Sequence, residues 1–284
     1  MDKWTWEEAV QWLCQQPDKK ALIQACYYDD PLIEAAKRFA DSEEWLAVQA
    51  FLPNSPNQAL DLGAGRGISS YALARNGWEV TALEPDSSSL VGAGAIRTLA
   101  MESGLPIRVM EEYAETLPFG DASFDLVYGR QVLHHARDLA LLCREVGRVL
   151  KPGGRFIATR EHVISKQEDL DIFLANHPLH KFYGGENAYL FSEYVSGISN
   201  SGLRIQKALG PFDSIINYFP MSHQEWQAKC RAPLSRFVGM WAAGLLTSER
   251  YFAGRWMLNR LSNWLSNRDH RPGRLYSFVA EKID

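Results

Sequence analysis

The chain has 284 residues, of which 46% are hydrophobic and 23% are charged, so it can bury a sizeable core and is not a disordered protein. A net charge of −4 argues against a dedicated nucleic-acid-binding protein, which is usually basic. The N-terminus lacks the basic and apolar layout of a signal peptide. The longest apolar run, residues 237–246, is far shorter than the roughly 20 residues of a membrane-spanning helix. We therefore expect a cytoplasmic protein without a membrane span.

The spacing of apolar residues along the chain changes near residue 53. Residues 1–52 carry apolar residues at helical spacing, such as Leu32, Ala36 and Phe39, and predict an N-terminal helical cap. Short apolar runs then alternate with helical stretches, which predicts a doubly wound parallel α/β sheet with helices on both faces. The predicted strands are 59–62, 79–83, 107–110, 124–128 and 155–159, and the predicted helices are 68–76, 87–103 and 139–150.

The C-terminal part is less regular. A helix is predicted over 192–201, and strands are predicted over 203–208 and 275–280. We interpret the chain as a cap over 1–52, a core formed by 53–208 with 274–284, and a helical insertion over 209–273 that forms a substrate lobe.

A glycine loop carries the main functional signal. The run Asp61-Leu62-Gly63-Ala64-Gly65-Arg66-Gly67 follows a predicted strand and precedes a helix, where glycines let the backbone approach a ligand and the helix N-terminus offers free N–H groups. Glu84, at the end of the second strand, can accept hydrogen bonds from ribose hydroxyls. Position 68 is isoleucine, so the loop fits the G-x-G-x-x-G dinucleotide fingerprint poorly, and it lacks the Lys-Ser/Thr of a P-loop. Loop and acid together predict a nucleotide-containing cofactor.

Four motifs in order resemble class I S-adenosylmethionine-dependent methyltransferases, within the broad group of small-molecule enzymes called methyltransferase type 11, and the whole chain resembles a bacterial subgroup of it. They are ALDLGAGRG, VTALEPD, AETLPFGDASFDLVYGRQVLHH and VLKPGGRFIATREH, and the resemblance covers at least residues 59–162. The resemblance implies a Rossmann-like sheet of seven strands with the last strand antiparallel. It also implies S-adenosylmethionine as the cofactor.

The same resemblance implies a set of cofactor-binding residues. The glycines would wrap the methionine part, Glu84 would bind the ribose hydroxyls, and Pro85 would pack on the adenine. Tyr113 stands where the family usually has an acid for the adenine amino group, which is a departure. Tyr27 either closes over the cofactor or packs as a core aromatic. The implied residues are Tyr27, Asp61, Gly63, Ala64, Gly65, Gly67, Glu84, Pro85, Tyr113, Ala114, Arg130 and Gln131.

Candidate catalytic residues follow the fourth and fifth strands, whose carboxyl ends share one edge of the sheet. Methylation of an oxygen needs a proton acceptor, for which histidine is suited, and a Glu-His pair can form a base with its orienting partner. The candidates are His134, His135, Glu161 and His162, and one of the first two histidines could instead have a structural role. His177, His180 and Tyr183 are further candidates. No metal site is predicted, because the spacing of the histidines matches no metal motif.

The insertion has its own composition. Residues 221–274 hold nine Lys or Arg and three Asp or Glu, a net charge of +6 that leaves −10 for the rest of the chain. This segment is either a cap for an anionic substrate, a surface for RNA or lipid, or a helical lobe with a solvated basic face.

The sequence as a whole predicts methyl transfer to a small-molecule or sugar-containing acceptor such as a glycan precursor, with oxygen as the favoured atom. The alternatives are a non-catalytic protein that binds S-adenosylmethionine or serves a partner enzyme, and an NAD(P)-dependent oxidoreductase. No nucleic-acid partner is expected, peripheral membrane contact stays open, and the sequence does not indicate an oligomeric state.

Overall fold

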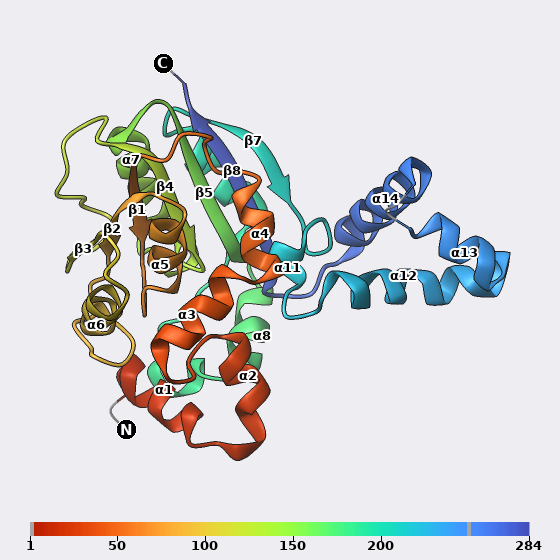
Figure 1. Ribbon diagram of the computed structural model, residues 1–284, viewed down its shortest axis with the longest axis horizontal. Helices are drawn as coiled ribbons and strands as arrows, with labels where there is room; N and C mark the ends of the chain where they lie inside the picture. The colour runs from red at the N-terminus through yellow and green to blue at the C-terminus, as the bar shows by residue number, and fades with distance from the viewer. Residues whose placement is uncertain (1–2, 249–250, 284) are drawn as a thin grey trace.

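The computed structural model describes residues 3–248 and 251–283, and within them a mixed sheet runs through the middle of the molecule (Figure 1). The strand order is β3-β2-β1-β4-β5-β8-β7, with β6 beside β5. β1 to β5 pair in parallel, whereas β8 is antiparallel to both β5 and β7, so the predicted class I sheet is confirmed. The strands are β1 (Gln58–Leu62), β2 (Glu79–Leu83), β3 (Ile107–Met110), β4 (Phe124–Arg130), β5 (Leu150–Ile164), β6 (Tyr189–Leu190), β7 (Leu203–Leu209) and β8 (Arg274–Lys282).

Helices cover both faces of the sheet because the side chains of its central strands alternate between two apolar cores. Leu60 and Leu62 of β1 face the core that contains α7 (Leu139–Val149) and α10 (Phe191–Ser199). Ala59 faces the opposite core, which contains α3 (Leu32–Ala40), α4 (Glu43–Gln49) and α5 (Ile68–Arg75). The central strands are buried on both faces, so their polar residues can contact a ligand only at the strand ends.

The N-terminal helices pack on a segment that follows β5. The N-terminal elements are α1 (Trp6–Cys14), the 3₁₀ turn η1 (Pro17–Lys19) and α2 (Lys20–Ala25), and α8 (Asp169–Asn176) and α9 (His180–Tyr183) form the later segment. α1 begins at a capping box in which Thr5 and Glu8 satisfy each other's backbone N–H groups. Trp6 packs on Tyr183 with ring centroids 4.7 Å apart, so residues far apart in the sequence form one cluster.

One helix boundary was predicted wrongly. α6 begins at Ala93 and ends at Ser103, whereas the serines at 87–89 predict a start near residue 87. The Ser88 hydroxyl accepts the N–H groups of Leu90 and Val91, at 2.9 and 3.1 Å, and so caps a turn instead of a helix. β6 and the 3₁₀ turn η2 (Leu133–His135) were not predicted from the sequence.

Four helices lie between β7 and β8. They are α11 (Ile215–Tyr218), α12 (His223–Val238), α13 (Met240–Leu246) and α14 (Phe252–Arg268). α11 packs against α4, whereas α12 to α14 project from the sheet as an arm, which is blue at the right of Figure 1. Trp226 holds the base of the arm, because its ring stacks on Phe212 and its indole N–H lies 3.2 Å from the Ser262 hydroxyl. No helix in the described part of the chain is long and apolar enough to cross a membrane.

Candidate active site

The glycine loop is bound to the end of the neighbouring strand β2. Gly63, Gly65 and Gly67 have φ values of 59°, 54° and 83°, a left-handed conformation that favours glycine. The N–H of Ala64 donates to the carbonyl oxygen of Leu83 at 3.0 Å, and the N–H of Gly65 donates to Glu84 Oε2 at 2.7 Å. The loop and the acid predicted to bind a cofactor together therefore form one hydrogen-bonded unit.

Two observations at this loop fit a bound ligand. A Cβ added at Gly65 would meet no described atom within 4 Å, whereas one at Gly63 would lie 2.3 Å from a methyl group of Val132. Asp61 accepts a hydrogen bond from the Ser70 hydroxyl at 2.6 Å through Oδ2, but its buried Oδ1 has no hydrogen-bond partner among the described residues. Open space beside a loop and an unsatisfied carboxylate oxygen suit a ligand that carries a cationic N–H donor.

Glu84 is buried at the carboxyl end of β2. Burial raises the pKa of its carboxyl group, and the N–H groups of Asp86 and Gly65 act against that rise by stabilising the charged form. A carboxylate has about four lone-pair positions, so the two backbone donors leave acceptor capacity for ribose hydroxyls. Pro85, predicted to pack on adenine, is exposed next to it.

Arg66 connects the glycine loop to the N-terminal cap, a role that sequence reasoning missed. Its Nη1 donates to the carbonyl oxygen of Tyr27 at 3.2 Å, and its Nη2 lies 2.5 Å from Asp30 Oδ1. The guanidinium is buried, whereas the Asp30 side chain is largely exposed, so the ion pair lies at the edge of the cap. A long cation between two loop glycines is the signal that could have pointed to this link.

Tyr27 and Arg130 belong to the packing of the cap on the sheet. The Tyr27 ring is buried edge-on against Phe39, with centroids 5.2 Å apart. Arg130 forms a two-pronged ion pair with the buried carboxylate of Glu44, at 2.8 and 3.1 Å. Arg130 is engaged by Glu44, whereas the buried Tyr27 hydroxyl has no hydrogen-bond partner among the described residues, and the cofactor contacts predicted for both stay predictions.

The remaining predicted cofactor residues lie on loops after β3 and β4. Tyr113 is exposed, with the Arg137 guanidinium 5.8 Å from its ring centroid, and Ala114 beside it is half-buried. Gln131 has a φ of 58°, and its N–H donates to the carbonyl oxygen of Thr159 at 2.9 Å. This bond fixes the direction of the loop that follows β4.

Glu161 holds that loop in place from β5. Its Oε1 accepts the N–H of Val132 at 3.1 Å, and its Oε2 accepts both the N–H and Nδ1–H of His134, at 3.1 and 2.7 Å. Glu161 is completely buried, and burial raises its pKa to about 7 although the backbone N–H groups of Val132, Leu133 and His134 favour the charged form. Its geometry is that of a residue that positions His134 and Val132, the latter packed against Gly63.

A bulge in β5 directs the Glu161 side chain toward the loop that follows β4. The register with β8 shifts between Ala158 and Glu161, where Arg160 has a φ of 62°. Arg160 Nη1 donates to the carbonyl oxygens of Ile216 and Phe219, at 2.8 and 3.1 Å, so it binds α11 and its neighbour rather than Glu161.

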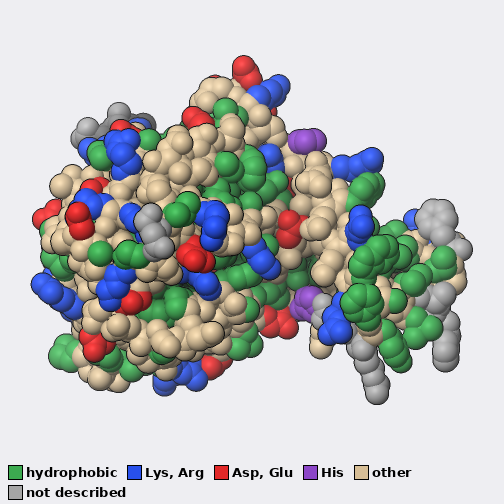
Figure 2. Space-filling model, turned by 90° about the horizontal axis from the view of Figure 1, so that it is seen from above, with side chains coloured by type: hydrophobic (Ala, Val, Ile, Leu, Met, Phe, Trp, Pro, Cys, Tyr) green, Lys and Arg blue, Asp and Glu red, His purple; other side chains and the backbone are tan. Residues whose placement is uncertain are grey.

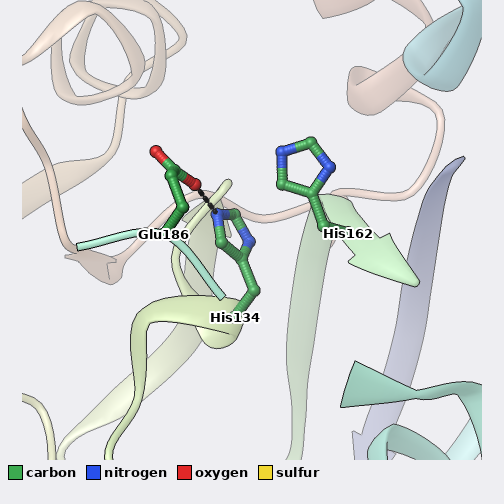
Figure 3. Close-up of side chains that lie close together, drawn as sticks. All are labelled: His134, His162 and Glu186. Atoms are coloured by element: carbon green, nitrogen blue, oxygen red, sulfur yellow. Dashed lines mark ion pairs between the residues drawn. The ribbon is translucent and has the colours of Figure 1, made fainter. Parts of the chain in front are cut away.

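His134, His162 and Glu186 converge from three separate segments (Figure 3). Their ligand-type atoms all lie within 4.8 Å of one another, and Nε2 of His134 is 3.7 Å from Oε2 of Glu186. Nδ1 of His162 lies 2.9 Å from the carbonyl oxygen of Gly273, which can only accept, so this nitrogen carries the proton. Glu186, which lies in a loop after α9, was not predicted, because no motif in the sequence marks it.

His134, His162 and Glu186 all direct hydrogen-bond acceptors toward one another. While Glu161 is ionised, both histidines donate through Nδ1, so Nε2 of each neutral ring is an acceptor, and the Glu186 carboxylate is an acceptor too. Burial lowers the pKa of His162 to about 3 and that of His134 well below its usual value, so both rings are neutral. Burial raises the pKa of Glu186, but the surrounding histidines and Tyr183 outweigh that effect and keep it low. The cluster therefore fits a hydroxyl or amine donor, and its spacing would also admit a divalent cation.

Further polar residues surround this cluster. His177 Nε2 lies 3.6 Å from Glu186 Oε1, and the Tyr183 hydroxyl donates to the same oxygen. His135 is exposed, and its Nδ1 lies 3.0 Å from the carbonyl oxygen of Gly185. The structure thus brings His134, Glu161 and His162 together, with His135 at the edge of the cluster.

Residues 60–158 match the family model of the methyltransferase domain. That match, the strand order and the loop geometry identify residues 60–158 as a class I S-adenosylmethionine-dependent methyltransferase domain, as the sequence motifs predict. The family model extends from within β1 to within β5, and this range includes the glycine loop and Glu84.

Several known proteins are similar to this chain. YcgJ of Bacillus subtilis, an uncharacterized methyltransferase, is 33% identical over 143 residues, which are 50% of this chain and 54% of that protein. Its solved structure has a TM-score of 0.54 and 21% identity, and covers 85% of this chain and 98% of that one, a likeness of fold. The ubiquinone biosynthesis O-methyltransferase of Rhizobium etli is 29% identical over 172 residues, 59% of this chain and 66% of that protein. The chain thus spans about half of the Bacillus relative and somewhat less than two thirds of the Rhizobium one.

Proposed function

We propose that this protein transfers a methyl group from S-adenosylmethionine to a hydroxyl oxygen of a small-molecule or glycan-precursor acceptor. The observation that carries the proposal is the convergence of three lone-pair acceptors, on His134, His162 and Glu186, next to the loop that follows β4. Two similar proteins, the Rhizobium enzyme and one from Aspergillus sclerotiorum, are O-methyltransferases by name, which supports oxygen as the acceptor atom.

The cofactor would supply an activated methyl group on a cationic sulfur, so the protein mainly provides binding and orientation. Gly63, Gly65 and Gly67 would hold its methionine part, and the open side of Gly65 leaves room for it. Asp61 Oδ1, which has no partner within the described chain, would accept a donor from the same part. Glu84 would use its remaining lone pairs for the ribose hydroxyls.

The histidine cluster would orient the acceptor. A hydroxyl that donates to Nε2 of His134 or His162 has its own lone pair available for in-line attack on the methyl carbon. As the new C–O bond forms and the C–S bond breaks, the hydroxyl becomes strongly acidic and its proton passes to the imidazole. An imidazole whose pKa is lowered by burial is then still a sufficient base. Glu161 acts through His134, because it fixes the proton on Nδ1 and leaves Nε2 free.

The test has two stages. Calorimetric titration with S-adenosylmethionine and with its demethylated product measures cofactor binding. A methyl-transfer assay with isotopically labelled cofactor then compares hydroxylated acceptors, including sugars and lipid-linked sugars, with amine analogues of the same acceptors. Transfer to hydroxyls that is lost in His162→Ala while cofactor affinity is kept would support the proposal.

The alternative functions give different results in the same assays. Tight cofactor binding without transfer to any acceptor would favour a non-catalytic binding protein, and binding of NAD(P) instead would favour an oxidoreductase. Transfer to amines but not to hydroxyls would contradict the proposed acceptor atom.

A further inference from the structure

The arm formed by α12 to α14 exposes large aromatic side chains, which proteins normally bury in their cores. Phe252, Trp256 and Trp264 on α14 are 79%, 50% and 49% exposed, and Met240 on α13 is 79% exposed. Figure 2 shows hydrophobic side chains gathered on this projecting part of the molecule, with basic side chains among them. An exposed apolar group of this kind marks an interaction site.

On α14 the exposed residues form one ordered ridge. Every fourth residue belongs to it, so consecutive members lie on neighbouring turns, and the ridge winds around the helix by about 40° at each step. The Arg260 guanidinium lies 5.2 Å from the Trp256 ring centroid, and that of Arg268 lies 4.3 Å from the Trp264 centroid. Aromatic and cationic side chains thus alternate along the helix. The members of this α14 ridge are Phe252, Trp256, Arg260, Trp264 and Arg268.

The charge of the arm is strongly one-sided. Arg255, Arg260 and Arg268 are exposed on α14, and Lys229 and Arg236 are exposed on α12. Among the described residues of α12 to α14, Glu225 is the one acidic side chain, and it is engaged in capping the first turn of α12. The arm therefore complements an extended negative surface, while the chain as a whole carries −4.

An apolar groove opens between α12 and α14 beside the ridge. It has a volume of about 340 Å³, and Trp264 lines both the groove and the ridge. Its other walls are apolar, among them Trp226, Leu234 and Leu261, with Lys229 also among its lining residues. An apolar slot next to cationic side chains suits an acyl or polyprenyl chain with an anionic headgroup.

We propose that α12 to α14 form a docking arm that binds the interfacial region of an anionic lipid bilayer. Trp and Phe side chains favour the boundary between headgroups and hydrocarbon, and Arg side chains extend their charged ends to lipid phosphates. The middle of the ridge, Trp256 to Trp264, offers both within about 80° of the circumference of α14, and the groove beside it accepts one lipid chain. A single-stranded RNA would use the same cations and the exposed tryptophans, but it carries no acyl or polyprenyl chain to occupy the apolar groove.

The experiment measures flotation of the full-length protein with vesicles. Vesicles of phosphatidylcholine alone are compared with vesicles in which phosphatidylglycerol replaces part of it. We expect binding to the anionic vesicles that weakens with added salt. The variant Arg260→Gln/Arg268→Gln should lose about thirtyfold in affinity, since each arginine near an anionic surface contributes about fivefold. The variant Phe252→Ala/Trp256→Ala should lose about tenfold per side chain through lost insertion.

A matched control variant tests whether any exposed apolar or basic residue has the same effect. Met101→Ala/Arg108→Gln changes an apolar and a basic side chain that are exposed on α6 and β3, away from the arm, and should bind vesicles like the wild type. Circular dichroism confirms that each variant is folded. Equal binding to neutral and anionic vesicles, RNA binding without vesicle binding, or a dimer held by the ridge with no vesicle binding would each overturn the proposal.

Discussion

Nδ1 of His134 lies 2.7 Å from the Oε2 atom of Glu161, and the same oxygen also accepts the backbone N–H of His134. One buried carboxylate thus fixes both the position and the proton of a histidine. This relationship makes Glu161 a positioning residue for the cluster with His162 and Glu186.

Glu161→Gln should weaken both the fold and catalysis. The amide keeps one acceptor oxygen but turns an NH₂ group toward backbone N–H donors, so we expect a loss of about 1–3 kcal/mol in the free energy of unfolding. Turnover should fall by more than cofactor affinity, because His134 loses its orientation. Denaturant unfolding and steady-state kinetics measure the two effects. The control Glu168→Gln changes an exposed carboxylate, and a similar loss there would contradict the assignment.

Gly65→Ala should abolish cofactor binding while the protein stays folded. Its φ of 54° costs an alanine about 1–2 kcal/mol, but the new methyl group meets no protein atom and enters the space assigned to the cofactor. Gly104→Ala is a matched control, with a φ of 65° and equally open surroundings at the end of α6. Thermal unfolding should show similar losses for both variants, and calorimetry should show lost affinity in the first alone. Equal cofactor affinity in the two variants would refute the loop assignment.

The pH dependence of kcat/KM should not show a decline at acidic pH that is caused by protonation of a histidine. Burial lowers the pKa of His162 to about 3 and also lowers that of His134, so both rings stay neutral as the pH falls through about 6.5, where an ordinary histidine is protonated. The lowered pKa of Glu186 acts in the same direction, since its carboxylate also stays charged. We therefore expect no such decline from these histidines, and we expect any decline near pH 7 to come from Glu161, whose pKa burial raises to about 7, and to be absent from the residual activity of Glu161→Gln. A decline centred near 6.5 that persists in Glu161→Gln would contradict the neutral rings of His134 and His162 as proton acceptors.

Metal removal should leave activity unchanged, whereas added zinc should inhibit. The proposed chemistry needs the free lone pairs of His134 and His162, and a zinc ion bound to them and to Glu186 would occupy those lone pairs. Turnover is measured after dialysis against EDTA and again with increasing zinc, at several acceptor concentrations. Inhibition should compete with the acceptor and disappear in Glu186→Ala. Loss of turnover on chelation, restored by a metal, would instead establish this cluster as a metal site.

The sheet and glycine loop were predictable because their signals are local. Alternating apolar runs predict β1 to β5, and a run such as Asp61–Gly67 carries its meaning within seven residues. α6 was predicted to start too early, because capping by Ser88 serves turns and helices alike.

The histidine cluster could be predicted only in part. His134 and His162 follow recognisable strands, but Glu186 joins them through a loop whose path depends on the packing of α9 against α1. The bulge at Arg160, which directs Glu161 inward, also depends on pairing with a strand more than a hundred residues later.

The link from Arg66 to Tyr27 and Asp30 has a kinetic consequence. The side chain that fastens the N-terminal cap stands between two glycines of the loop that would contact the cofactor. Binding of S-adenosylmethionine to the loop should therefore order the N-terminal cap before an acceptor binds. We expect compulsory-order kinetics in which S-adenosylmethionine binds first. Product-inhibition patterns distinguish this sequence from random entry, and a random pattern would mean that the cap holds its place whether or not the loop is filled.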